Sequence, residues 1–257
     1  MLLVLNVGSS SLKAAVLQAT AARSTELWRT ETQRQGALQD QLGHWLAPQL
    51  KRWWPEIKAA GHRVVHGGES FIAPTRITVA VLEQLNAVSA LAPLHNPPAL
   101  EAIRWLQQLR PTLPQWACFD TAFHASLPPE ASTYALPSAW RQLGCRRYGF
   151  HGLNHQHVAE TAPCPRVISA HLGAGCSLAA VREGRSIDTT MGFTPLEGLV
   201  MASRSGSVDP GLLLHLQRQG LSLDELDQGL NHESGLLGLS GLSSDWRQLR
   251  SAAAAGH

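Results

Sequence analysis

Short apolar runs and longer amphipathic runs alternate along the chain, separated by segments rich in glycine and proline. Short apolar runs are typical of buried strands, and apolar residues that recur every three or four positions are typical of helices. Such a helical spacing runs from Leu38 to Ile57, where Pro48 predicts a break or kink. We predict strands at Leu27–Thr32, Arg63–Val65 and Gln115–Phe119, and helices at Val79–Ser89, Pro98–Leu109, Gly152–Glu160, Leu212–Gln217, Leu223–Gln228 and after Asp245.

Two distant segments share one pattern, an apolar strand, a turn of small residues and a second apolar strand. They are LVLNVGSSSLKAAVL at Leu3–Leu17 and ISAHLGAGCSLAAVR at Ile168–Arg182, and Gly8 aligns with Gly173. Turns of glycine and serine let backbone N–H groups approach a polyanion closely. The pattern fits a duplicated fold that holds a nucleotide phosphate chain, and it also fits two ordinary hairpins of similar composition.

Composition excludes several classes of function. The 257 residues carry a net charge of only +2 with no run of lysines or arginines, so we expect no binding to nucleic acid or membrane. The four cysteines form no C-x-x-C pair, which argues against zinc and redox sites. Residues 1–7 read as a first strand, not as a signal peptide, and no stretch is long enough to span a membrane. We expect a cytoplasmic protein.

Polar residues cluster between glycines and prolines in five ordered motifs: HRVVHGGES (62–70), APLHNPP (92–98), CFDTAFH (118–124), RRYGFHGLNHQH (146–157) and DTTMGFTPLEGLVMASRSGSVDP (188–210). Together with LNVGSSSLK (5–13) and SGLLGLSGLSSDWR (234–247), they closely resemble the acetate kinase family over nearly the whole chain. This family belongs to the superfamily of sugar kinases, heat-shock chaperones and actin. The resemblance implies an α/β, duplicated two-lobed actin-like (ribonuclease H-like) fold, with a first lobe at 1–147 and a partial second lobe at 148–257.

The resemblance also implies a function, the Mg²⁺-dependent, reversible transfer of a phosphoryl group from ATP to acetate, giving acetyl phosphate and ADP. A propionate or butyrate kinase of the same family is an alternative. The full-length family member is expected to be a homodimer. A kinase that acts on a carboxylate must neutralise charge, because nucleophile and phosphoryl donor are both anions.

Four residues are implied to be catalytic. Arg63 is expected to hold the substrate carboxylate, and Arg204 to stabilise the transferring phosphoryl group. Asp120 matches an aspartate that acts through Mg²⁺ and the orientation of the reactants, and His151 matches a histidine that hydrogen-bonds the phosphoryl oxygens. Each type of residue also has an ordinary structural use, a surface salt bridge for the arginines and a helix N-cap for the aspartate.

The resemblance assigns further residues to two groups. The pocket for the acetate methyl group is implied to contain Val65, Leu94, Phe150 and Pro195. The nucleotide and its phosphates are implied to lie against Asn6, Ser9, Ser11, Lys13, His171, Gly173, Ala174 and Gly175, with Asn6 also near Mg²⁺ and His95 in support. Valine at position 65 favours acetate over propionate.

Two departures from the family pattern are visible. Ala174 replaces the asparagine that many members carry, so backbone N–H groups must hold the phosphate there. The adenosine loop Gly-Gly-Ile-Gly-Glu and a later glutamate that places Mg²⁺ do not occur in the sequence. We therefore expect a C-terminally truncated chain, whose own activity is open and which could be a catalytically incompetent fragment. The spacing of His151, His155 and His157 could suggest zinc, but no cysteine or carboxylate completes such a site.

Overall fold

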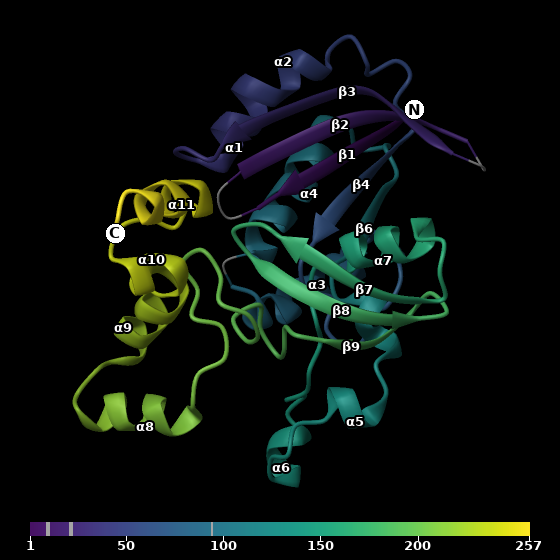
Figure 1. The fold of residues 1–257 in the computed structure, drawn as a ribbon. Coiled ribbons are helices and arrows are strands. Elements are labelled where there is room, and N and C mark those ends of the chain that lie inside the picture. Colours follow the sequence, from purple (N-terminus) through teal and green to yellow (C-terminus); the bar gives the residue numbers. More distant parts are fainter. Residues whose placement is uncertain (9–10, 21–22, 94) are drawn as a thin grey trace. The chain divides into compact units, whose positions relative to one another are not determined.

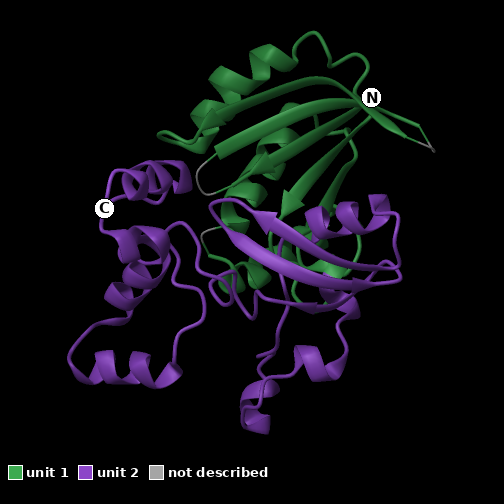
Figure 2. Ribbon diagram, viewed as in Figure 1, with its two compact units in different colours: residues 1–123 green, residues 124–257 purple. Residues whose placement is uncertain are grey.

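The computed structural model describes residues 1–8, 11–20, 23–93 and 95–257. Contacts divide the chain into two compact units, Met1–Phe123 and His124–His257 (Figure 2). Each unit is described by itself below. Ser9 and Leu94, two of the predicted site residues, lie outside the described residues.

A six-stranded mixed sheet forms the centre of unit 1 (Figure 1). Its strands are β1 (Leu2–Val7), β2 (Ser11–Ala19), β3 (Ser24–Gln33), β4 (Ala59–Val64), β5 (Thr75–Arg76) and β6 (Gln115–Phe119). They lie in the order β3-β2-β1-β4-β6-β5, and only β1, β4 and β6 run parallel to their neighbours within that set. The carboxyl ends of these three parallel strands therefore share one edge of the sheet.

The helices of unit 1 are α1 (Leu38–Asp40), α2 (Ala47–Leu50), α3 (Val79–Val88) and α4 (Asn96–Leu109), with a 3-10 turn at Ser89–Leu91. The helical run is not broken at Pro48, which lies in the first turn of α2; the irregularity is a π-helical turn just before it, at Gln41–Leu46, and the run ends at Leu50. Leu38, Leu42, Leu46 and Leu50 nevertheless all face the core, which they share with β1 and β2. The helical spacing thus survives the irregular turn, because the same side chains stay buried.

Helix α4 begins two residues before the predicted start. Asn96 is fully buried, and its side chain accepts a hydrogen bond from the backbone N–H of His66 and donates one to the carbonyl of His66. This pair of bonds fixes the start of α4 to the loop that follows β4, at distances of 3.0 and 2.9 Å. The helix therefore helps to set the position of Val65.

Unit 2 contains a three-stranded antiparallel sheet, β7 (Arg166–Leu172), β8 (Cys176–Arg182) and β9 (Arg185–Thr189). Its helices are α5 (Pro129–Ser132), α6 (Ser138–Arg141), α7 (Gly152–Thr161), α8 (Pro210–Arg218), α9 (Leu223–Gln228), α10 (Gly235–Ser240) and α11 (Trp246–Ala254), with a π-helical turn at Gly229–Glu233. A 3-10 helix, Ala122–Ser126, spans the division between the units. Asp245 caps α11 as predicted, since its side chain accepts from the N–H of Arg247.

The two faces of strand β7 differ sharply. Ser169 is 1% exposed and shares its face with the residues that pair across to β8, His171 opposite Ser177. The other face carries Ile168 and Leu172, which are 78% and 77% exposed. Strand alternation therefore places polar groups on the covered face and apolar groups in water, the reverse of the usual arrangement.

Both segments of the sequence repeat form the predicted hairpins. In the first hairpin Val7 pairs with Leu12, and in the second Leu172 pairs with Cys176. The second turn is therefore one residue shorter than the first, so the strands pair with registers that differ by one position. Each turn is closed by a backbone bond, Gly8 N–H to Ser11 O at 2.9 Å and Gly173 N–H to Gly175 O at 3.0 Å.

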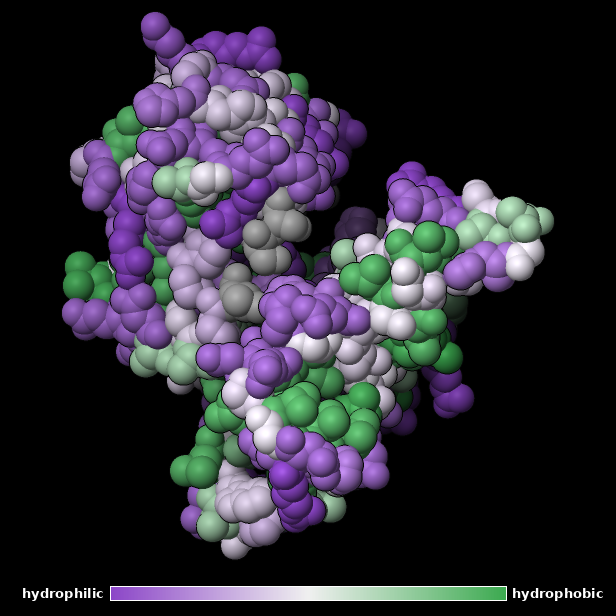
Figure 3. Space-filling view, turned by 90° about the vertical axis from the view of Figure 1, so that its left-hand side faces the viewer, coloured by the Kyte–Doolittle hydropathy of each residue, from purple (hydrophilic) through white to green (hydrophobic). Residues whose placement is uncertain are grey.

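Apolar side chains also gather on the surface of the C-terminal helices, on the face shown in Figure 3. Exposed large side chains of the C-terminal segment include Leu223, Leu239 and Trp246, at 72%, 79% and 61%. Among the described residues, the helices are all too short or too polar to cross a bilayer.

Candidate functional site

Three predicted residues meet at the edge where the parallel strands of unit 1 end. Asn6 lies on β1, Arg63 on β4, and Asp120 directly follows β6. Arg63 Nε donates to both carboxylate oxygens of Asp120, at 3.2 and 3.0 Å, and Nη1 donates to Asn6 Oδ1 at 3.1 Å. Side chains that are far apart in the sequence thus form one hydrogen-bonded group.

The charges of this group are strongly coupled. Asp120 is only 2% exposed, whereas the side chain of Arg63 is 26% exposed. Burial lowers the pKa of Arg63, but the charge and hydrogen bonds of Asp120 more than offset this, and the pKa is raised overall. Arg63 is therefore a permanent cation, held in a fixed orientation by a buried carboxylate.

Asn6 and Asp120 each carry a side-chain oxygen, and oxygen is the type of ligand atom that Mg²⁺ prefers in proteins. A magnesium site in a kinase typically uses one or two protein oxygens and completes its shell with water and phosphate. Within the described parts of the chain, no group of three or more His, Cys, Asp or Glu side chains is placed to hold a metal. The donors present thus fit a magnesium ion that is held mainly by its nucleotide.

The loop after β4 is held rigidly beside this edge. Val65 is 4% exposed, and the N–H of Gly67 donates to the hydroxyl of Thr121 at 3.1 Å. A methyl group added at Gly67 would lie 2.5 Å from the carbonyl of Phe71, so only glycine fits there. The buried position of Val65 is compatible with both ordinary core packing and a small apolar pocket.

Two other predicted residues of unit 1 lie on β2. Lys13 pairs in register with Asn6, but its ammonium forms a salt bridge with Glu31 on β3, at 2.9 Å and about half exposed on both sides. Ser11 begins the same strand, and its carbonyl closes the first turn. Neither side chain joins the group around Arg63 through a hydrogen bond in the described part of the structure.

In unit 2, the predicted phosphate turn lies against two of the predicted catalytic side chains. A methyl group built on Gly175 would be 3.3 Å from His151 Nε2 and 3.6 Å from Arg204 Nη1. The carbonyl of Ala174 accepts from the N–H of Ala202, at 3.1 Å. The glycine turn, an imidazole edge and a guanidinium therefore converge on one point.

The backbone aims His151 at this point. His151 has a φ of 57°, in the left-handed region that a non-glycine residue adopts at a cost, and it is the N-cap residue of α7. Its ring stacks on that of His171, with 3.9 Å between the ring centroids. Strain of this kind is concentrated at functional sites, because the surrounding contacts must hold it in place.

Arg204 is fixed from a different direction. Its Nη1 donates to the carbonyl of Pro195 at 3.1 Å, which joins two more of the predicted residues. Burial lowers the pKa of Arg204, yet an arginine retains its charge throughout the physiological range. A backbone carbonyl thus contacts the Arg204 guanidinium, and a carboxylate contacts that of Arg63.

The loop that carries Pro195 is anchored by residues that the sequence analysis missed. Arg147 Nη2 donates to Glu197 at 2.9 Å, and the hydroxyl of Tyr134 donates to the same carboxylate. Arg147 Nη1 also donates to three successive carbonyls, those of residues 189–191. The motif RRYGF contained Arg147, but nothing in the local sequence indicates a partner 50 residues away.

Behind His151 lies a buried chain of hydrogen bonds. His151 Nδ1 lies 2.9 Å from Ser177 Oγ, and the same hydroxyl lies 2.9 Å from His155 Nε2. His155 Nδ1 in turn lies 2.8 Å from Ser169 Oγ. Burial lowers the pKa of His155 to about 4, so this ring is neutral at neutral pH. The sequence analysis had considered His155 only as a possible zinc ligand.

Phe150 is buried, as expected of a pocket or core residue, and is fixed through its backbone. Its carbonyl accepts from His124 Nε2 at 3.0 Å, while His124 Nδ1 lies 2.8 Å from Ser186 Oγ. Burial lowers the pKa of His124 to about 4. The neutral His124 must therefore carry its proton on Nε2, because a carbonyl oxygen can only accept.

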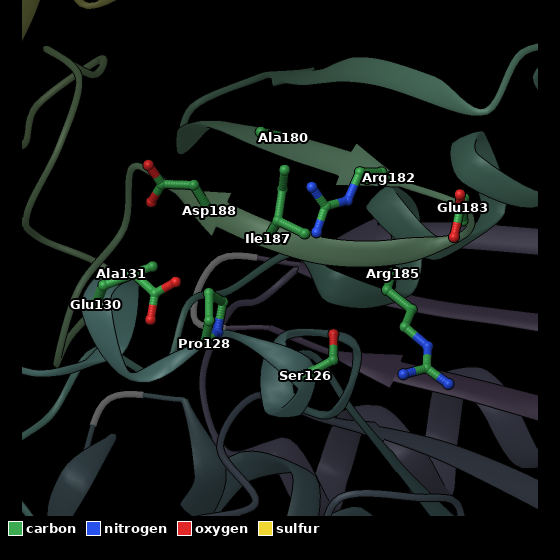
Figure 4. A pocket seen from close by; sticks show the side chains of 10 residues that line it. All are labelled: Ser126, Pro128, Glu130, Ala131, Ala180, Arg182, Glu183, Arg185, Ile187 and Asp188. Carbon is green, nitrogen blue, oxygen red and sulfur yellow. The ribbon is translucent and has the colours of Figure 1, made fainter.

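Two of the cavities in the described part of the structure are lined by residues of unit 2. One, of about 860 Å³, lies between the phosphate turn, with Gly173 and Ala174, and the start of α11, with Trp246 and Arg247. The other, of about 920 Å³, is lined by charged side chains of β8, β9 and the segment from Ser126 to Ala131 (Figure 4). It contains none of the predicted site residues.

The predicted residues therefore form two groups. Asn6, Arg63, Val65 and Asp120 lie in unit 1; Phe150, His151, His171, Gly173, Ala174, Gly175, Pro195 and Arg204 lie in unit 2. Within each unit, most of these residues are hydrogen-bonded to one another or lie close to one another. His95, another predicted residue, lies at the start of α4 in unit 1.

Comparison with known proteins links these groups to a family. The model of the Acetokinase family matches residues 29–257. The acetate kinase of Synechococcus sp. (strain JA-2-3B'a(2-13)) is 48% identical over 297 residues, an alignment that covers 100% of this chain and 74% of that protein. The acetate kinase of Deinococcus radiodurans is 48% identical over 286 residues, covering 99% and 72%.

Solved structures give the same result. A propionate kinase from Francisella tularensis superposes with a TM-score of 0.90 at 40% identity, over 100% of this chain and 74% of that one. The acetate kinase of Porphyromonas gingivalis superposes with a TM-score of 0.86 at 34% identity, over 99% and 73%. These matches confirm the α/β, actin-like fold predicted from the sequence.

Proposed function

Because the chain belongs to the acetokinase family, we propose that it catalyses reversible phosphoryl transfer between ATP and acetate, giving acetyl phosphate and ADP. The observation that carries this proposal is the convergence of Gly175, His151 and Arg204 on one point. Backbone N–H groups, an imidazole and a guanidinium are the groups that stabilise a phosphoryl group as it is transferred.

Each of the three components has a distinct task in unit 2. The turn of Gly173, Ala174 and Gly175 offers its backbone to the phosphates, and this does not require a side chain at position 174. Arg204 neutralises the equatorial oxygens, and Pro195 O holds its guanidinium in place. His151 donates a hydrogen bond from Nε2, the ring nitrogen nearest to Gly175.

Unit 1 is proposed to bind the carboxylate of the acceptor. Arg63 binds the acetate carboxylate, and Asp120 holds the planar guanidinium in one orientation for a bidentate contact. The methyl group is proposed to lie against Val65, Leu94, Phe150 and Pro195. Catalysis then requires Arg63 and Arg204, one in each unit, to approach the same phosphoryl group.

Magnesium is proposed as the accompanying ion, and side-chain oxygens of Asn6 and Asp120 would help to hold it. When bound, it would neutralise phosphate charge and help to align donor and acceptor. The oxygens of both side chains already receive hydrogen bonds from Arg63, so this guanidinium and the ion would share them. The family glutamate that also places the ion has no counterpart in this sequence.

Several further predictions remain part of the proposal. They are the functional lobes at 1–147 and 148–257, a homodimer, a cytoplasmic location, and Ser9, Ser11, Lys13, His95 and His171 as contacts to the nucleotide, its phosphates or their neighbours. Light scattering on the purified chain measures the oligomeric state. A mass of about 28 kDa would contradict the dimer, since one chain has a mass of 27.8 kDa.

The test of the function is acetyl phosphate formation by the purified chain, trapped as the hydroxamate, with ATP, Mg²⁺ and acetate. We expect turnover that falls by about 10²–10³-fold in Arg204→Ala, the usual effect of losing one donor to a developing charge. Arg218→Ala is the matched control, because that arginine is exposed on α8 in the same unit. Equal activity in Arg204→Ala and the control would refute the site.

The same assay separates the alternatives. A folded chain with no turnover on any acid would indicate a catalytically incompetent fragment. Higher turnover on propionate or butyrate than on acetate would favour the other acids, a possibility raised by the 40% identical propionate kinase. We expect acetate to be preferred, because the valine side chain at position 65 leaves less room than a smaller residue would.

A further inference from the structure

The hydrogen-bonded chain behind His151 has a direction that can be worked out. It runs from His151 through Ser177 and His155 to Ser169, with heavy-atom distances of 2.8–2.9 Å. Ser177 and His155 have no solvent exposure, and Ser169 has 1%. Water is therefore excluded from the three residues that support His151, and each proton among them must be shared between protein atoms.

The number of protons allows only two arrangements. A neutral imidazole has one N–H, so His155 donates to one serine and accepts from the other. Ser177 has one hydroxyl hydrogen, which is buried and needs an acceptor, so it donates to one histidine and accepts from the other. All the bonds therefore point along the chain in the same sense, either from Ser169 towards His151 or from His151 towards Ser169.

Ser169 decides between them. Among the described residues, its hydroxyl has a single hydrogen-bond partner, His155 Nδ1. If His155 donated to Ser169, the serine O–H would be buried without an acceptor, at a cost of roughly 1–3 kcal/mol. If Ser169 donates to His155, the O–H is satisfied. The second arrangement is favoured, so His155 donates from Nε2 to Ser177, and Ser177 donates to His151 Nδ1.

We propose that Ser177 and His155 are positioning residues that hold neutral His151 with its proton on Nε2, the nitrogen nearest to Gly175 and Arg204. The proposal deepens the function proposed above and rests on it, because it gives His151 a donor at the point where the phosphoryl oxygens are proposed to lie. In this tautomer, neutral His151 donates a hydrogen bond from Nε2 and needs no second proton to do so. It can therefore still donate to phosphate at a pH above the pKa of imidazole.

Other titratable groups face His151 and must be considered. His171 of β7 stacks on its ring, Arg204 approaches the same side of Gly175, and His155 of α7 contacts it through Ser177. His124 meets His155 edge to face, with 5.7 Å between centroids.

The first test reads the tautomers directly and needs no activity. Long-range ¹H–¹⁵N spectra of the histidine-labelled chain at pH 7.5 assign each ring by its coupling pattern. We expect Nε2–H for both His151 and His155. His124 is an internal reference, since it must donate from Nε2 to the carbonyl of Phe150. A proton on Nδ1 of His155 would overturn the proposal, whatever the enzyme assay shows.

The second test uses Ser177→Ala and the pH dependence of turnover. Without the hydroxyl, neutral His151 divides between two tautomers, whereas protonated His151 still carries a proton on Nε2. We expect turnover at pH 7.5 to fall about 10–100-fold, as for other residues that orient a catalytic ligand. Part of that loss should be recovered near pH 6, below the imidazole pKa of about 6.5. The unmodified chain should show no such gain.

Two further variants separate positioning from stability. Ser186→Ala removes another buried serine that bonds a buried histidine, but one outside the chain to His151. It should leave the tautomer of His151 and the shape of the pH profile unchanged. Ser169→Ala removes the hydrogen bond that His155 Nδ1 accepts, so it should weaken the preference of His155 for a proton on Nε2. An equal fractional loss at pH 6 and pH 7.5 in Ser177→Ala would mean that the serine is only structural.

The outcomes also distinguish this inference from the proposed function. Nε2–H tautomers in a chain without turnover would support the hydrogen-bonded chain and count against the kinase activity of this polypeptide. Normal turnover with a proton on Nδ1 of His155 would support the kinase activity and overturn the proposed direction of the hydrogen bonds.

Discussion

Replacing Asp120 by asparagine should destabilise unit 1 far more than the loss of one charge on its surface would. The substitution preserves the shape of the side chain but removes the charge that three hydrogen bonds from Arg63 address. It also turns an amide N–H towards a guanidinium, which has no acceptor to offer. Arg63 is then left with a partly buried charge and Asn6 as its remaining partner.

The magnitude follows from the exposure of the two side chains. Breaking a fully buried ion pair by removing one partner costs about 3–5 kcal/mol. Asp120 is 2% exposed, but Arg63 is 26% exposed and can recover some hydration. We therefore expect a loss of about 2–3 kcal/mol. For a unit of this size, at roughly 3 °C per kcal/mol, Tm should fall by about 6–9 °C.

Glu31→Gln is the matched control, since it removes the carboxylate partner of Lys13 on the same sheet. Both partners of that pair are about half exposed, so the expected loss is about 0.5 kcal/mol or less. Tm by differential scanning calorimetry and urea unfolding at pH 7.5 measure both variants. If Asp120→Asn and Glu31→Gln differ by less than about 0.5 kcal/mol, the reasoning about the buried pair is wrong.

Three further predictions concern pH and the two halves of the site. Burial lowers the pKa of His62, His124 and His155 to about 4. The unfolded chain binds these protons near pH 6.5, so the free energy of unfolding should fall as pH drops from about 6.5 to 4, by up to about 4 kcal/mol per pH unit; a urea midpoint unchanged between pH 7.5 and 5.5 would contradict this. Gly175→Ala places a methyl group between the imidazole and guanidinium edges, so turnover should fall at least about tenfold with less than about 1 kcal/mol of lost stability; full activity would exclude this point as the phosphoryl site. Val65→Ala should raise the ratio of propionate to acetate turnover by roughly tenfold, and an unchanged ratio would remove this residue from the acid pocket.

The sequence was sufficient to predict the parts of the site that lie at strand ends and in turns. Asp120 follows an uninterrupted apolar run, and the two hairpins share a recognisable pattern, so their positions depend on local sequence alone. The meeting of Asn6, Arg63 and Asp120 also follows once β1, β4 and β6 are parallel neighbours, because parallel strands present the same ends at one edge.

The supporting contacts could not be predicted in this way. Which serines His155 contacts depends on how α7 packs on β7 and β8, and no local pattern encodes that packing. A signal was nonetheless present, because Ser177 shares a face of its strand with Ala179 and Val181, which are both buried. A hydroxyl at such a position needs a partner inside the protein, so it should be examined as part of a buried network.

The alternation of β7 has a practical consequence for handling the protein. Ile168 and Leu172 face water, whereas Ser169 between them points to the opposite side and supports the imidazoles. Adjacent residues of a strand never share a face. In this seven-residue strand, the exposed apolar residues that favour aggregation therefore alternate with the residue that supports the imidazoles. Lysine or threonine at position 168 should therefore improve solubility without reaching Ser169, whereas Leu172 also lines the cavity beside the turn that begins at Gly173.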